Sequence, residues 1–235
     1  MARSSHKLPL WTLKLAVKLS GRPTGVSDEL KQFIADHGCI FIHIPKCAGM
    51  AVQKSLFGDT YFGHQTIRQY EVALPADLYR KAWKFAVTRC PWERLVSAWL
   101  FLKAGGYHIH VDEVFFEKNL SQYSTFDHFV NDWLVYQDPD RCGCVHFKSQ
   151  LHYLCNFKGQ IAVDYLVKLT DLQVKYSYLK DIVGGGELIV YNQNQVLCND
   201  HMSYYTSNET FNNVAELYKE DVRQLGYTNR LGASL

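Results

Sequence analysis

The sequence lacks any excess of one charge, because its 235 residues include 25 lysines and arginines against 23 aspartates and glutamates. A general nucleic-acid-binding protein normally carries a clear basic surplus, so this balance argues against that class and leaves room only for a local anion site. The chain also lacks low-complexity segments and internal repeats at solenoid periods. Its length suits one sizeable α/β domain rather than two.

Long apolar runs are lacking as well. Lys14 and Lys18 interrupt the apolar stretch near the N-terminus. Its longest charge-free run falls far short of the ~20 residues that a bilayer-spanning helix needs. Two interpretations stay open for residues 1–30, which end in a glycine-rich linker. They form a basic amphipathic arm that docks on the domain, which we favour, or one that contacts a membrane surface peripherally. We expect residues 31–235 to form a single domain.

A regular cysteine framework is missing too. The seven cysteines are an odd number without even spacing. The close pair Cys142 and Cys144 has no histidine after it at zinc-finger spacing. We therefore expect reduced thiols, no metal site and a cytoplasmic protein.

Short β-rich apolar runs do alternate with helical patterns. Strands are expected over 39–44, 83–88 and 161–169, and helices over 51–57, 92–102 and 209–225. Pro91 fits the first turn of the second helix, and Asp171 is expected to cap the helix after the third strand. This alternation predicts an α/β fold, in which a central parallel sheet has helices on both faces. Ligands of such sheets bind beyond the carboxyl ends of the strands.

Two loops lie at this edge. The first, residues 45–50, is a strand-to-helix turn of small residues in which backbone amides and Lys46 favour an anion. The pattern G-x-x-x-x-G-K-[ST] is absent, so no hydroxyl is placed to ligate magnesium. The second loop carries Arg89, and Ser97 follows about two turns along the next helix. The alternatives to an anion site are that Lys46 is a solvated surface lysine and that Arg89 pairs with Glu93. Taken together, however, the two loops predict a ligand with two separated anionic groups.

Five segments, in order, resemble those of the carbohydrate-type (family 2) sulfotransferases. FIHIPKCAGMAV resembles F-x-H-x-P-K-T-G-G-T-S, and FAVTRCPWERLVSAW resembles F-x-x-R-N-P-W-D-R-L-V-S-A-Y. GHQTIRQY resembles the short G-H segment between them, and HFKSQ…LTDL and YYTSNET…LGY resemble the two later ones. The resemblance covers about residues 38–227.

The family that this chain resembles is related to heparan sulfate O-sulfotransferases. The resemblance implies a P-loop-like three-layer sandwich and the donor 3′-phosphoadenosine 5′-phosphosulfate. Arg89 and Ser97 would bind the 3′-phosphate, and Lys46 would stabilise charge on the bridging oxygen as sulfate leaves. The 5′-phosphosulfate would be held by the loop residues Pro45, Lys46, Cys47, Ala48, Gly49, Met50 and Ala51.

Sulfuryl transfer also needs a base for the attacking hydroxyl or amine. His64 stands where the family has its catalytic histidine, and a pKa near 6.5 suits the proton transfer. His146 matches another family position and is the second candidate, whereas His43 is expected to be structural. The transferred group carries less charge than a phosphoryl group, so lysine, arginine and backbone amides suffice without a metal.

The loop Cys47–Ala51 replaces Thr-Gly-Gly-Thr-Ser of the family, and Lys168–Leu172 replaces Arg-x-Glu-Asn-Leu. Hydrogen bonds to a charged group are worth roughly 1.5–3 kcal/mol each, so weaker donor binding is expected. The predicted activity is transfer to a glycan or a small-molecule alcohol or amine. A non-catalytic relative that binds the nucleotide or an anionic partner is the main alternative, and a nucleotide kinase the remote one.

Overall fold

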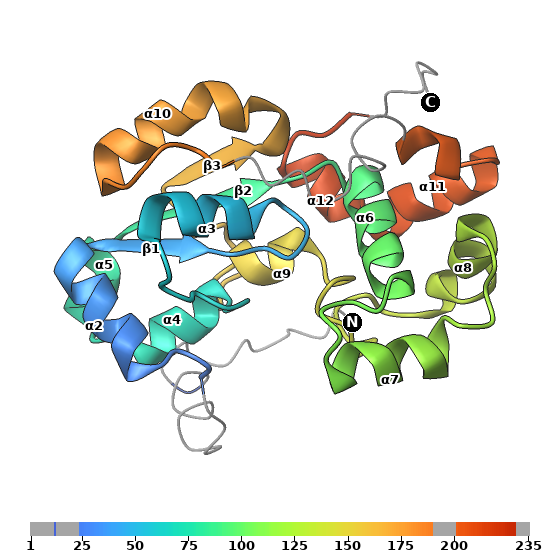
Figure 1. The fold of residues 1–235 in the computed structure, drawn as a ribbon, viewed down its shortest axis with the longest axis horizontal. Coiled ribbons are helices and arrows are strands. Elements are labelled where there is room, and N and C mark those ends of the chain that lie inside the picture. Colours follow the sequence, from blue (N-terminus) through green and yellow to red (C-terminus); the bar gives the residue numbers. More distant parts are fainter. Residues whose placement is uncertain (1–11, 13–23, 190–200, 229–235) are drawn as a thin grey trace, which may run out of the picture.

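A computed structural model describes residues 12, 24–189 and 201–228 (Figure 1). Most of the arm expected over residues 1–30 lies outside these described residues. The first long described helix, α2, begins at Asp28, where the Ser27 side chain accepts a hydrogen bond from the backbone N–H of Leu30.

The centre of the fold is a parallel sheet of three strands in the order β1-β2-β3. The strands are β1 (Cys39–Ile42), β2 (Trp83–Thr88) and β3 (Tyr165–Lys168). All of β1 and all of β2 except Trp83 are buried, as expected for strands covered on both sides. Helices surround the sheet, with α2 against β1 and α10 against β3 (Figure 1). The predicted α/β fold with a central parallel sheet is confirmed.

The helices connect and cover the strands. They are α2 (Asp28–His37), α3 (Gly49–Phe57), α4 (Ile67–Ala73), α5 (Ala76–Lys81), α6 (Pro91–Lys103), α7 (His110–Asn119), α8 (Phe126–Asp132), α9 (Gln150–Leu154), α10 (Leu172–Val183), α11 (Asn208–Leu217) and α12 (Lys219–Gln224). Short 3-10 turns are η1 (Leu134–Tyr136), η2 (Leu169–Asp171) and η4 (His201–Tyr204).

Several details differ from those expected. The first strand ends at Ile42 rather than at residue 44, and α3 begins at Gly49 rather than at residue 51. The third strand is only four residues long, because Ile161 pairs with Cys155 in an isolated antiparallel bridge. The helix expected over 209–225 is broken at Tyr218, which ends α11 and precedes α12. Asp171 is the N-cap residue of α10 as expected, but its side chain makes no cap hydrogen bond, and its carboxylate accepts a hydrogen bond from the Thr170 hydroxyl instead.

Two separate hydrophobic cores stabilise the fold. One surrounds the sheet, and the other lies among α6, α8 and α11, to the right of the sheet in Figure 1. In the second core, the rings of Trp92 and Phe211 stack at 4.7 Å. The helix α6 follows β2 directly and belongs to this second core. Side chains at the end of β2 and the start of α6 therefore lie where the two cores meet.

Candidate active site

The loop between β1 and α3 turns through two non-glycine residues with positive φ. Lys46 has a φ of 68° and Ala48 a φ of 57°, a conformation that is uncommon for residues with a side chain. Ala48 is the N-cap of α3 and makes no side-chain cap hydrogen bond. The amides of the first turn of α3 therefore stay available to an anion, which the helix dipole also favours.

Gly49 is required by a neighbouring ring. A Cβ atom at this position would lie 1.9 Å from Cδ2 of His43, so the imidazole fills the space beside the glycine. We expected the small residues of this loop to admit an anion close to the backbone. The structure adds a second reason for Gly49, namely the packing of His43, which is itself 4% exposed.

The ammonium group of Lys46 lies over an aromatic ring of α6. Its Nζ lies 3.8 Å from the centroid of the Phe101 ring, a cation–π contact. Burial, followed by the charges of Arg89 and Arg94, lowers the pKa of Lys46 to about 8. Lys46 is thus a partly desolvated cation beside the loop, and the alternative of a fully solvated surface lysine does not hold.

Arg89 connects the two loops expected to bind anions. Its Nη1 donates to the carbonyl oxygen of Lys46 at 3.4 Å, and its Nη2 donates to Nε2 of His201 at 2.8 Å. Its Nε lies 3.6 Å from Glu93, so the alternative ion pair is present. Ser97 lies on α6 with 5% exposure, and the described contacts of Arg89 do not include it.

Arg94 is a second arginine at the loop and was not predicted. It is 2% exposed. Its Nε donates to the carbonyl of Pro45 at 2.9 Å and its Nη1 to the carbonyl of Lys148 at 2.8 Å. Its Nη2 is buried and has no hydrogen-bond partner among the described residues. Such an unpaired buried donor is costly, and a bound anion would satisfy it.

The side chain of Gln150 connects the two loops by hydrogen bonds. Its Oε1 accepts from the backbone N–H of Arg89 at 2.9 Å and from the thiol of Cys47 at 3.6 Å, while its Nε2 donates to the Arg89 carbonyl at 2.8 Å. The carboxylate of Asp221 accepts from the backbone N–H groups of Gln150 and Leu151. Burial raises the pKa of Cys47 to about 11, so the thiol stays protonated. Cys47 therefore supports the loop through its side chain.

His64 lies beside this loop in a defined tautomer. Its Nδ1 is 2.9 Å from the carbonyl oxygen of His43 and must donate to it, which leaves Nε2 unprotonated in the neutral ring. Burial is the main cause that lowers the pKa of His64 below its ordinary value of 6.5. A neutral imidazole with a fixed tautomer can accept a proton near neutral pH.

His146, the second candidate base, lies in the same cluster. Its ring centroid is 6.3 Å from that of His64 and 4.8 Å from that of Phe101. Its Nε2 lies 3.7 Å from Oδ1 of Asp112. Burial, with the charge of Lys46, lowers the pKa of His146 to about 3. Such a weak base accepts a proton poorly, and His64 is favoured for the role.

The structure thus brings Lys46, His64 and Arg89 to one end of the sheet, and these roles stay predictions. The side chain of Met50, one of the loop residues expected to bind the donor, is 46% exposed. Ala48 and Ala51 line a cavity of about 210 Å³ together with residues of η2 and α10. Phe101 and His201 were missed because their contacts are distant in sequence. Arg94 and Gln150 stood in the quoted motifs and could have been noticed there.

Within the described part of the chain, no helix is both long and apolar enough to cross a membrane. No three histidine, cysteine, aspartate or glutamate side chains of the described residues gather in a way that could hold a metal ion.

A model of the sulfotransferase family matches residues 33–228. No curated protein and no solved structure matches the chain. The matched region includes the sheet, all of the second core, the first core except Val26 and Leu30, and all the loops of the site described above. This chain therefore belongs to the sulfotransferase family.

Proposed function

We propose that the protein transfers a sulfuryl group from 3′-phosphoadenosine 5′-phosphosulfate to a hydroxyl or amine of a glycan or small-molecule acceptor. The observation that carries this proposal is the meeting of Lys46, Arg89 and the uncapped first turn of α3 beside the neutral His64. The family match over residues 33–228 supports sulfuryl transfer in general and a single domain over residues 31–235.

In this proposal the donor lies between the two loops. Residues 45–51 take the 5′-phosphosulfate through backbone amides, and Arg89 with Ser97 takes the 3′-phosphate. Arg89 would exchange its long bond to the Lys46 carbonyl, 3.4 Å, for a stronger charge-assisted one. The buried Nη2 of Arg94 lacks a partner among the described residues and fits an anion at the same loop.

The chemistry is an in-line displacement at sulfur. Nε2 of His64 accepts the proton of the acceptor hydroxyl or amine, whose lone pair forms the new bond to sulfur. The bond from sulfur to the bridging oxygen breaks, and its electron pair leaves on the 5′-phosphate of 3′-phosphoadenosine 5′-phosphate. The ammonium of Lys46 and the amides of α3 stabilise that developing charge.

The test is a transfer assay with the full chain, donor labelled in the sulfuryl group, and a panel of glycans and small alcohols and amines. We expect a labelled product with a gain of about 80 daltons, the mass of SO₃, formed equally well in a metal chelator. His64→Ala is expected to lower turnover by about 10²-fold. His146→Ala is the matched variant, and a loss confined to it would reverse the two roles.

A second function, nucleotide or anion binding without turnover, is favoured by one observation. The side chains of Met50 and Ala51 offer no hydroxyl at the first turn of α3. Stabilisation by donor product without transfer to any acceptor would support this function. Transfer of phosphate from ATP that stops in chelator would instead indicate a kinase.

A further inference from the structure

A cavity of about 660 Å³ opens beside His64, on the side formed by α4, the start of α9 and the segment before it. This volume lies within the range of small-molecule sites. Its polar lining includes His64, Arg68, Gln69, Lys148 and His152, and no carboxylate is part of the lining. The cavity therefore combines the proposed base with a cationic wall.

The two cations of this wall are not neutralised. Nη2 of Arg68 donates to the carbonyl oxygen of His152 at 3.1 Å. Nζ of Lys148 donates to the carbonyl oxygen of Asp140 at 3.0 Å and lies 3.3 Å from Nε2 of His152. Within the described part of the chain, neither side chain forms an ion pair with a carboxylate. Both retain N–H donors for a ligand.

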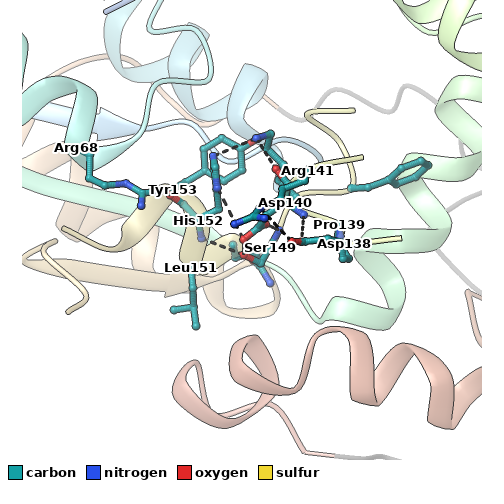
Figure 2. Close-up of polar contacts among 12 residues, drawn as sticks. Arg68, Asp138, Pro139, Asp140, Arg141, Ser149, Leu151, His152 and Tyr153 are labelled. Atoms are coloured by element: carbon teal, nitrogen blue, oxygen red, sulfur yellow. Dashed lines mark hydrogen bonds and ion pairs between the residues drawn. The ribbon is translucent and has the colours of Figure 1, made fainter. Parts of the chain in front are cut away.

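The carboxylate of Asp140, which lies close to His152, is turned toward the start of α9 (Figure 2). It accepts from the backbone N–H of Ser149 at 2.8 Å and from its hydroxyl at 3.1 Å. It lies 3.8 Å from Nδ1 of His152. Burial and then the charge of Lys148 nevertheless lower the pKa of His152 to about 4. The cations thus outweigh Asp140 at this ring, which stays neutral.

We propose that this cavity binds an anionic group of the acceptor, a carboxylate or a sulfate ester, through Arg68 and Lys148. That contact would place a neighbouring hydroxyl of the acceptor at Nε2 of His64. The proposal rests on the proposed function, because it names the class of acceptor that the site uses.

A neighbouring cavity of about 640 Å³ shares Arg68 and His152 but does not suit an anion. Its lining also contains Asp140, Glu216, Glu220 and Asp221, whose negative charges repel such a ligand. The cavity on the His64 side is the one that combines positive charge with the base.

The test compares probes that differ in one group. Dissociation constants of methyl β-D-glucuronide, methyl β-D-glucoside and methyl β-D-glucoside 6-sulfate are measured by protein-observed NMR, with 3′-phosphoadenosine 5′-phosphate present. We expect the glucuronide or the sulfate ester to bind at least tenfold more tightly than the neutral glucoside, and the stronger of the two identifies the anion. Arg68→Ala and Lys148→Ala should each remove most of this preference.

Arg80→Ala is the matched control, because Arg80 is an exposed arginine that also donates to a backbone carbonyl, that of Ala76. It should leave the preference unchanged. Stabilisation by 3′-phosphoadenosine 5′-phosphate should be the same in every variant, which shows that each folds and keeps the donor site. Equal or absent binding of all three probes, or a preference that survives Arg68→Ala and Lys148→Ala, would overturn the proposal. Loss of donor-product binding by the natural protein would instead contradict the proposed function.

Discussion

Among single residues, Lys46 has the largest role in the proposed mechanism, in which its ammonium stabilises the charge that develops on the leaving phosphate. Lys46→Ala should lower kcat by about 10²–10³-fold, as expected for loss of one such donor. The affinity for donor product should fall much less, because the contact strengthens in the transition state. Steady-state kinetics and calorimetric titration of the same variant separate the two effects.

Lys46→Arg is the matched variant and should restore activity only in part. A planar guanidinium cannot take the place of a compact ammonium in a turn with a φ of 68°. If Lys46→Ala turned over normally, the contact with Phe101 would be the only role left for this lysine.

The pH dependence of kcat/KM for the donor follows from the same pair of residues. In the proposed mechanism His64 acts in its neutral form, and its pKa lies below 6.5, so activity should fall only when the pH drops below that value. Lys46 acts in its protonated form in the same proposal, and its pKa is about 8 in the free protein. Activity should therefore also fall as the pH rises through about 8.

A rate profile over pH 5 to 10 checks both limbs. Lys46→Arg should lose the alkaline limb, because arginine stays charged over this range. An alkaline limb that persists unchanged in Lys46→Arg would assign it to another group.

The sequence predicted some of these residues and not others for a physical reason. Lys46, His64 and Arg89 follow from local patterns and from the family resemblance. The contacts of Phe101 with Lys46 and of His201 with Arg89 join residues 55 and 112 positions apart. Such contacts depend on the packing of separate elements, which local periodicity does not report.

Among the elements, α3 has Met50 and Ala51 in its first turn where the resemblance implies a threonine and a serine. Met50 is exposed and Ala51 is half-buried, so both positions accept other side chains. Met50→Thr with Ala51→Ser should tighten donor binding by a few-fold to tenfold, since one recovered hydrogen bond is worth about 1 kcal/mol. Calorimetric titration with 3′-phosphoadenosine 5′-phosphate measures the change.

Met202→Thr is the control, because Met202 is a comparably exposed methionine outside the loop. An affinity that does not change in the double variant would show that backbone amides alone bind the phosphosulfate. Activity that arises only in the double variant would favour the binding-only function for the natural protein.

Element boundaries were predicted less well than element types. The apolar patterns correctly placed β2 over residues 83–88 and α6 from Pro91. They missed the break at Tyr218, where the hydroxyl donates to the carbonyl of Phe147 at 2.7 Å. A tertiary contact of this kind leaves no periodic signal in the sequence.

For the whole molecule, the alternation of strands and helices predicted the parallel sheet and the edge at which both loops lie. It did not predict the second core among α6, α8 and α11. The aromatic side chains of that core come from segments far apart in sequence, such as Trp92 and Phe211. Its position matters for the site, because α6 carries Arg94 and Phe101, which contact Pro45 and Lys46 of the loop after β1.

The central claim, that the two loops bind a donor with two anionic ends, is tested most directly by ligand-dependent thermal unfolding of the full chain. A ligand at 100 times its dissociation constant stabilises the folded state by about 2.7 kcal/mol. We predict that 3′-phosphoadenosine 5′-phosphate raises the midpoint by several degrees and that adenosine 5′-phosphate, which lacks the 3′-phosphate, does so much less. Arg89→Ala should remove this difference and leave the unliganded midpoint nearly unchanged. Equal stabilisation of the natural protein by the two nucleotides would contradict the account.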